Sequence, residues 1–232
     1  MVTLKIMNVI KRYKSKKVLN GINLEIKQGN IVALIGPSGV GKTTLLNIIM
    51  GLCYKDEGKI IYNGEELNIP YKKYIRSKIA YIPDNPIFYD YLTGMENLMY
   101  LKNIYDSEIT DNQLEVYLRM FNLFNSKDKI FKEYSKGMKQ KLMLLSTYIT
   151  NADILILDEP TTGLDIVSCY ELKDIIIDFK KMKKTILLAT HDINFCQQVA
   201  DSIAIIRNGQ IVYEGINEKD AKLQELVIGH LK

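Results

Sequence analysis

The stretch Gly36-Pro37-Ser38-Gly39-Val40-Gly41-Lys42-Thr43 decides the fold of this chain. It follows the apolar run Ile31–Ile35, which is typical of a buried strand, and precedes apolar residues at helical spacing. Glycines at its first, fourth and sixth positions let the loop wrap so that backbone amides and a helix N-terminus face phosphate groups. In such a loop the Lys42 amine contacts the β and γ phosphates, and the Thr43 hydroxyl ligates Mg²⁺. The order strand, loop, helix therefore predicts a nucleoside triphosphate site, with an incidental glycine-rich turn as the alternative.

The predicted phosphate-binding residues form one continuous segment. Its members are Gly36, Pro37, Ser38, Gly39, Val40, Gly41, Lys42, Thr43 and Thr44.

Two further apolar runs end in residues that suit phosphate chemistry. The run 154–157 leads into Asp158, which suits Mg²⁺ through water, and Glu159, which could accept a proton from an attacking water. The run 186–189 leads through Thr190 to His191, a candidate sensor of the γ phosphate. Ligands of α/β sheets bind at the carboxyl ends of the strands, where all three residues are expected. A solvated acidic turn and a capping or core histidine are the plainer alternatives.

The remaining pattern predicts an α/β fold with a mainly parallel sheet. Strand-like runs at 154–157, 185–189 and 202–206 alternate with helical stretches at 166–181 and 193–199. Two partly alternating runs near the N-terminus predict an antiparallel β region. They are residues 4–9 and 22–26, separated by the basic segment 11–17, while residues 91–149 have helical spacing and 217–232 predict a terminal helix. We expect a P-loop NTPase core with an N-terminal antiparallel β region and a helical subdomain insertion.

Composition narrows the possible functions. The 232 residues are 47% hydrophobic, but no apolar run approaches the roughly 20 residues of a membrane span. Three scattered cysteines argue against a disulfide framework or a zinc cluster. The net charge of +4 is mild and only four of the 31 basic residues are arginine, so nucleic-acid binding is not expected.

The segment Tyr134-Ser135-Lys136-Gly137-Met138-Lys139-Gln140 identifies a family. With the phosphate loop, Asp158-Glu159 and His191, it resembles the signature motif of the nucleotide-binding subunit of an ABC transporter, with Lys and Met at its third and fifth positions. The resemblance covers nearly the whole chain. It implies ATP and Mg²⁺ as cofactors and two subunits that close head to tail, so that Ser135 and Gly137 of one cover ATP held by the other.

The resemblance also implies roles for other residues. Tyr13 would stack on adenine, Glu159 would be the catalytic base, His191 would contact the γ phosphate, and residues 163–165 would cross the dimer. It further implies a single ABC ATPase domain over residues 1–232, with its core at 1–83 and 151–232 and the helical subdomain with the signature at 84–150.

The partners follow from the same resemblance. They are an integral membrane permease and a second ATPase subunit, in a homodimer or a heterodimer, with no nucleic acid. The protein would then be cytoplasmic and peripheral on the inner face of the cell membrane. A soluble ABC ATPase without a membrane partner and a P-loop kinase are the alternatives.

One position departs from the family's usual pattern. After the strand at 78–82 most members carry glutamine, whereas this chain has Asp84. A carboxylate can still bind Mg²⁺ through water, so Asp84 is a candidate metal residue beside Thr43 and Asp158. The acid and the signature variant resemble the branch that exports drugs, antibiotics or bacteriocin peptides.

Overall fold

The computed structural model describes residues 2–219 and 222–231. Its strands are β1 Val2–Tyr13, β2 Lys16–Lys27, β3 Ile31–Ile35, β4 Glu57–Tyr62, β5 Glu65–Glu66, β6 Ile79–Ile82, β7 Ile154–Asp158, β8 Thr185–Thr190, β9 Ser202–Arg207 and β10 Gln210–Ile216. Its α-helices are α1 Lys42–Ile49, α2 Lys73–Lys78, α3 Gly94–Ile104, α4 Asp111–Met120, α5 Lys136–Thr150, α6 Ile166–Lys181, α7 Ile193–Val199 and α8 Lys222–Leu231, with short 3₁₀ turns at Phe124–Ser126 and Phe131–Glu133.

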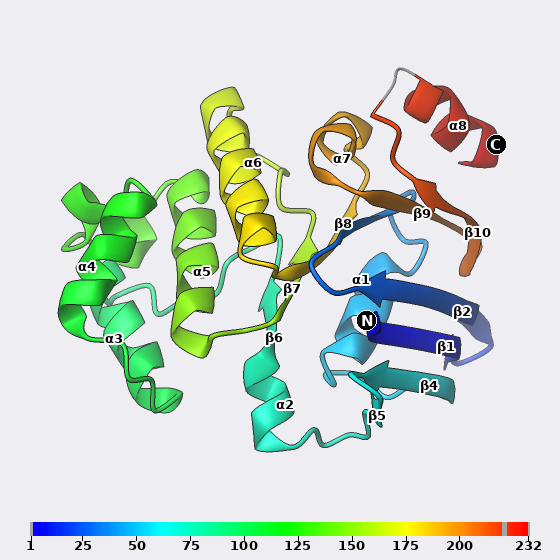
Figure 1. Cartoon of the computed structure of the whole chain (residues 1–232), viewed down its shortest axis with the longest axis horizontal. Helices are drawn as coiled ribbons and strands as arrows, with labels where there is room; N and C mark the ends of the chain where they lie inside the picture. Colours follow the sequence, from blue (N-terminus) through cyan, green and yellow to red (C-terminus); the bar gives the residue numbers. More distant parts are fainter. Residues whose placement is uncertain (1, 220–221, 232) are drawn as a thin grey trace.

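A six-stranded sheet forms the centre of the molecule, in the order β10-β9-β3-β8-β7-β6 (Figure 1). Strands β6, β7, β8, β3 and β9 pair in parallel, and β10 pairs antiparallel to β9 at one edge. Parallel strands end at the same edge of a sheet, so β3, β7 and β8 bring the phosphate loop, Asp158 and Thr190 together.

Both faces of this sheet are covered, which explains the continuous apolar runs in its strands. Along β7, Leu155 and Leu157 face a core shared with α5, α6 and α7, while Ile154 and Ile156 face a second core shared with α1. All five residues of β7 are buried. The alternation of side chains along one strand therefore divides the apolar residues between two layers.

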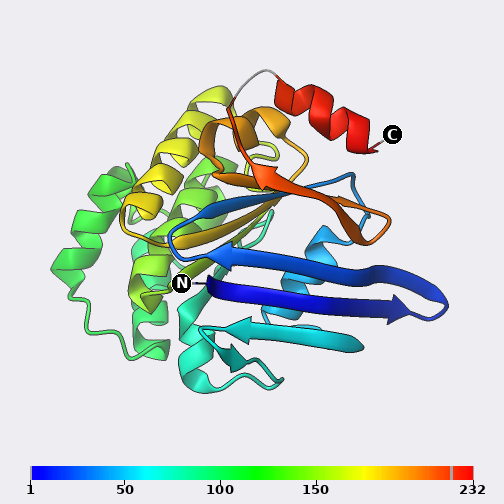
Figure 2. The ribbon, with the colours of Figure 1, turned by 45° about the vertical axis from the view of Figure 1, so that its right-hand side comes forward.

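An antiparallel sheet in the order β2-β1-β4-β5 covers the far side of α1 (Figure 2). The β1–β2 hairpin turns at Lys14, which has a φ of +53°, and its β2 strand lies beside the turn between β9 and β10. The backbone N–H of Asn20 donates to the Gly209 carbonyl at 2.7 Å. This hairpin closes over the phosphate loop, because a Cβ on Gly41 would lie 3.1 Å from the Val18 carbonyl oxygen.

The segment between β6 and β7 carries α3, α4 and α5, which extend to one side of the sheet (Figure 1). Helices α3 and α4 each begin with a capping box, at Thr93 with Glu96 and at Thr110 with Gln113. Ser135 caps α5 by accepting a hydrogen bond from the Met138 N–H at 3.2 Å. No helix within residues 2–219 and 222–231 is both long enough and apolar enough to cross a membrane.

The predicted α/β fold with a parallel core and an antiparallel N-terminal region is confirmed. Residues 31–35 form β3 as predicted, and the predicted strands at 4–9, 22–26, 154–157, 185–189 and 202–206 lie inside observed ones. The predicted strand at 78–82 is one residue too long, because Lys78 ends α2 and β6 begins at Ile79. The prediction that the basic segment 11–17 separates the two N-terminal strands is wrong, since only Lys14 and Ser15 lie outside them. The hairpin extends because its polar side chains alternate outward while the apolar ones face the core.

The C-terminal prediction was partly wrong. The strand β10 precedes the final helix, which occupies 222–231 rather than beginning near residue 217, and residues 220, 221 and 232 lie outside the described residues. Asn217 instead fixes the end of β10, because its side-chain amide donates to the carbonyls of Cys196 and Ala200. The strands β4 and β5 were not predicted.

Candidate nucleotide-binding site

The phosphate loop joins β3 to α1. Its first residue, Gly36, has no room for a larger side chain. A Cβ on Gly36 would lie 2.6 Å from the Ile206 carbonyl oxygen, while Gly39 and Gly41 have φ values of +77° and +113° that favour glycine. Pro37, Ser38 and Gly39 are exposed. The loop therefore presents its backbone to solvent directly before the first turn of α1, where unpaired amides can bind phosphate.

Lys42 lies beneath this loop and is only 5% exposed. Its Nζ donates to the Gly36 carbonyl at 2.7 Å and lies 3.1 Å from Oε1 of Glu159. The buried ammonium group thus links the phosphate loop to the acid that follows β7. This position suits an amine that neutralises phosphate oxygens.

Asp158 accepts two hydrogen bonds on one carboxylate oxygen. Thr43 Oγ1 donates to Oδ2 at 2.9 Å, and the Tyr81 hydroxyl donates to the same oxygen at 3.2 Å. Burial raises the pKa of Asp158 above its ordinary value, and these two hydrogen bonds partly offset the rise. Tyr81 remains a donor because its own burial raises the pKa of its hydroxyl.

The second oxygen of Asp158 tests whether these residues fit Mg²⁺. Oδ1 is buried and has no hydrogen-bond partner among the described residues. A carboxylate oxygen left without a donor costs free energy, and a hydrated cation would satisfy it. With the Thr43 hydroxyl 2.9 Å from Oδ2, the donor set is the hard oxygen kind that Mg²⁺ prefers, so the residues fit the ion.

Glu159 and His191 lie in contact. The Glu159 backbone has a φ of +48°, and its N–H donates to the Ala189 carbonyl at 2.8 Å, which fixes it beside the end of β8. Oε2 accepts from Thr190 Oγ1 at 3.1 Å and lies 2.8 Å from Nδ1 of His191. The carboxylate is thus held between Lys42 on one side and His191 on the other.

Ser135 and Gly137 occupy a different position, at the start of α5. Ser135 is exposed and its hydroxyl caps the helix, while Gly137 packs against α6, where a Cβ would lie 2.5 Å from Ser168 Oγ. These contacts join α5 to itself and to α6. In the described residues they do not join the signature motif to the phosphate loop of the same chain.

Tyr13 and Asp84 complete the set of predicted site residues. Tyr13 ends β1, is half-exposed, and has its hydroxyl 3.3 Å from Cys53 Sγ and its ring centroid 5.2 Å from Lys11 Nζ. Asp84 lies two residues beyond β6, and its Oδ1 accepts a hydrogen bond from Lys136 Nζ at 2.7 Å.

The family model of the ABC transporter matches residues 19–162, which is more than half of the chain. The chain belongs to the ABC transporter family. It is an ATP-binding and ATP-hydrolysing subunit of that family.

Curated relatives span nearly the same length. The chain is 34% identical over 223 residues to the lantibiotic transport ATP-binding protein SrtF of Streptococcus pyogenes, covering 96% of this chain and 95% of that protein. It is 29% identical over 230 residues to the lipopolysaccharide export system ATP-binding protein LptB of Haemophilus influenzae, again covering 96% and 95%.

Solved structures agree with this assignment. An ATP-binding subunit of an ABC transporter superposes with a TM-score of 0.87 at 30% identity, covering 99% of this chain and all of that one. A dimeric ATP-binding cassette described as a post-hydrolysis state with ADP and phosphate superposes with a TM-score of 0.82 at 26% identity, covering 93% and 99%.

Some contacts at the site of this ABC ATPase were not predicted from its sequence. Among them are those of Tyr81 with Asp158, Thr190 with Glu159, and Lys136 with Asp84. The first two could have been found from the sequence, because a residue with a hydroxyl group at the carboxyl end of a predicted parallel strand is expected to lie at the site. The third could not have been found in this way, since 52 positions separate Lys136 from Asp84.

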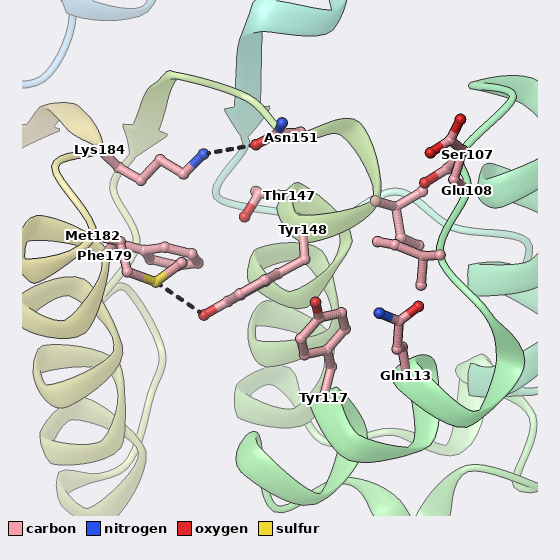
Figure 3. Close-up of a pocket in the computed structure, with 12 residues that line it drawn as sticks. Ser107, Glu108, Gln113, Tyr117, Thr147, Tyr148, Asn151, Phe179, Met182 and Lys184 are labelled. Atoms are coloured by element: carbon pink, nitrogen blue, oxygen red, sulfur yellow. Dashed lines mark hydrogen bonds between the residues drawn. The ribbon is translucent and has the colours of Figure 1, made fainter.

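A pocket separate from the nucleotide site lies near the amino ends of β7 and β8, opposite the ends that carry Asp158 and Thr190. It has a volume of about 660 Å³ and lies between α4, the end of α5 and the end of α6 (Figure 3). Tyr117 and Tyr148 line it with ring centroids 4.5 Å apart, and Lys184 donates to Asn151 at its upper rim. None of the predicted nucleotide-site residues lines this pocket.

Proposed function

We propose that this ABC ATPase is the motor of an exporter and that it completes its ATP sites only as a head-to-tail dimer. One observation carries the proposal. The phosphate loop, Asp158, Glu159 and His191 lie together at one edge of the sheet, whereas Ser135 and Gly137 contact other elements. A second subunit supplies the signature motif that a single chain does not bring to its own phosphate loop.

The residues of one chain divide the work of binding. Lys42 and the backbone N–H groups of residues 38–44 hold the phosphates, and the half-exposed ring of Tyr13 stacks on adenine. Thr43 and Asp158 hold Mg²⁺, which neutralises phosphate charge when bound. The exposed hydroxyl of Ser135 and the Gly137 backbone, at a helix N-terminus, contact the γ phosphate held by the other chain.

Hydrolysis then needs a base and a fixed γ phosphate. Glu159 takes a proton from water as the water oxygen bonds to the γ phosphorus. The bond between the γ phosphorus and the oxygen that bridges the β and γ phosphates of ATP breaks, and ADP leaves with that oxygen. His191 holds the carboxylate through the 2.8 Å contact and contacts the γ phosphate with the other nitrogen of its ring. Lys42, which touches Glu159 in this structure, moves onto the phosphates when the nucleotide binds.

The exporter's membrane subunit is a separate permease, and an apolar cavity between the core and the helical segment 84–150 supports a docking place for it. The cavity has a volume of about 350 Å³, and its lining includes Leu52, Ile87 and Tyr105. Leu52 is 68% exposed and Ile87 is 78% exposed, which is costly unless a partner covers them. The ATPase is then cytoplasmic and peripheral on the inner face of the membrane, with residues 84–150 as the subdomain between the nucleotide and the permease.

Two relatives support an export role, since one is a lantibiotic transport protein and the other belongs to a lipopolysaccharide export system. We propose that the cargo is an antibiotic or bacteriocin peptide, because the chain is similar to SrtF and has an acid at position 84.

Co-purification tests the partner. The tagged chain is extracted from its host's membranes in mild detergent, and the bound integral protein is identified. A permease that is lost on Leu52→Glu and Ile87→Glu substitution supports the proposal, with Ile216→Glu as a control at a distant exposed apolar position. Recovery of the chain only in the fraction without membranes would favour an ABC ATPase that has no membrane partner.

A further inference from the structure

The third residue of the signature motif makes an ion pair inside its own chain. Lys136, in the first turn of α5, donates from Nζ to Oδ1 of Asp84 at 2.7 Å. Asp84 is the acid that stands where glutamine is usual, and the Asn85 side-chain amide lies 3.5 Å from its other oxygen. Two of the residues at which this chain departs from the family's usual pattern are therefore partners of each other.

The stem of Lys136 also contacts the loop that follows β7. A Cβ on Gly163 would lie 3.3 Å from Cδ and 3.4 Å from Nζ of Lys136, and Gly163 has a φ of +72°. Lys136 thus bridges the segment after β6 and the segment after β7. Its ammonium group is paired with Asp84 and lies close to Gly163.

Asp84 leaves the sheet at the same edge as two other acids. Strands β6 and β7 pair in parallel with Ile82 opposite Leu157, so Asp84 leaves the same edge of the sheet as Asp158 and Glu159. Lys42 lies against Glu159, and Lys136 lies against Asp84. A nucleotide brings further negative charge to this edge, and like charges repel one another.

We propose that Lys136 is a positioning residue that neutralises Asp84 and holds it away from the bound phosphates, so that a third carboxylate is tolerated at the nucleotide site. The inference rests on the proposed function of that site. It assigns to the signature lysine a role within its own chain, separate from the contact of Ser135 and Gly137 with the second subunit.

If Lys136 only stabilised the fold, its removal would lower the thermal unfolding midpoint. The side chains of Lys136 and Asp84 are 31% and 39% exposed, and ion pairs this exposed contribute little to folding stability. Removal of the lysine should therefore leave the thermal unfolding midpoint almost unchanged while it weakens nucleotide binding.

Binding of ADP with Mg²⁺, measured by titration calorimetry on the full chain, tests the proposal without hydrolysis. The proteins are wild type, Lys136→Met, Asp84→Asn, the double variant, and Lys136→Arg as a conservative replacement. Lys139→Met is the matched control, because Lys139 lies in the same turn of α5 but has its Nζ 4.9 Å from the Phe131 ring centroid rather than on Asp84.

We expect Lys136→Met to raise the dissociation constant by about five- to tenfold, a coupling of the size seen for contacting charges. The same substitution in the Asp84→Asn background should change it less than twofold, and Lys136→Arg and Lys139→Met should bind like the wild type. An equal loss in both backgrounds, or an equal loss in Lys139→Met, would overturn the inference, since Lys136 would then act without Asp84. If the wild type binds no nucleotide, the proposed function fails as well, so the two failures are distinguishable.

Discussion

Glu159 is the residue on which the account of hydrolysis depends. It contacts Lys42, Thr190 and His191 at once, and its backbone has a left-handed conformation that is uncommon for glutamate. Such strain persists only where surrounding contacts fix it, and it occurs often at functional sites. The contacts hold the carboxylate beside the ends of β7 and β8.

Glu159→Gln should keep ATP affinity and lower turnover at least about 100-fold, because it removes the proton acceptor and leaves the groups that bind phosphate in place. Equilibrium binding of ATP and steady-state phosphate release measure the two effects. Glu171→Gln, which changes an acid paired with Lys141 on the outer helices, is the control. Undiminished phosphate release from Glu159→Gln would remove the glutamate from its role as base.

Lys42→Ala should act on binding itself. Loss of a buried ammonium that serves charged phosphates removes about 1.5–3 kcal/mol, or roughly ten- to 100-fold in affinity. Titration with ATP and Mg²⁺ checks this, and Lys139→Ala on α5 controls for loss of one positive charge. If Lys42→Ala binds like the wild type, the amine does not contact the phosphates.

Individual site residues could be predicted from the sequence where a short motif contains the groups that bind phosphate or Mg²⁺. Gly36 to Thr43, Asp158 and Glu159 were predicted because their spacing follows from what phosphate and Mg²⁺ require. The contact of Lys136 with Asp84 could not be predicted, because it depends on how α5 is placed against the segment after β6. No periodicity of either segment contains that information.

Among the elements, β3 and α1 determine the geometry of the phosphate loop. Gly36 is required there by a close approach, with the Ile206 carbonyl 2.6 Å from where a Cβ would stand. Strand β9 therefore acts on the phosphate loop through its backbone. The strands β4 and β10 were not predicted because neither has a run of fully buried apolar residues. In β4 the apolar residues follow Glu57, Gly58 and Lys59, and no residue of β10 is buried.

Gly36→Ala should destabilise the fold by about 1–3 kcal/mol and weaken nucleotide binding, because the added methyl group pushes the loop away from β9. Denaturant unfolding and ATP titration measure both losses. Gly229→Ala in α8, where no atom lies within 4 Å of the added Cβ, should be neutral or stabilise by up to about 1 kcal/mol. Normal binding and stability in Gly36→Ala would show that the loop adjusts freely.

Helix α5 carries an unsatisfied polar group in its buried face. Gln140 is 2% exposed, and both polar atoms of its amide have no hydrogen-bond partner among the described residues. Gln140→Leu should raise the free energy of unfolding by about 1 kcal/mol, since a buried unpaired amide costs about 1–3 kcal/mol. Denaturant unfolding checks the direction, and a lower stability in the variant would mean that the amide is satisfied in solution.

For the molecule as a whole, the central claim is that two chains share each ATP site. The exposed apolar residues Ile166 and Val167 begin α6 directly after the loop 163–165, next to the signature motif. This surface and the phosphate loop are the two halves that the head-to-tail arrangement brings together. The solved dimer with ADP and phosphate has the same fold as this chain.

Mixing two inactive variants tests that claim most directly. Ser135→Arg blocks the signature and Lys42→Ala blocks the phosphate loop, so each protein alone should hydrolyse little ATP. In an equal mixture half the dimers are mixed, and each of these has one site with native Lys42 and native Ser135, so phosphate release should recover to about a quarter of the wild-type rate. A mixture no more active than the two variants measured separately would contradict the shared site.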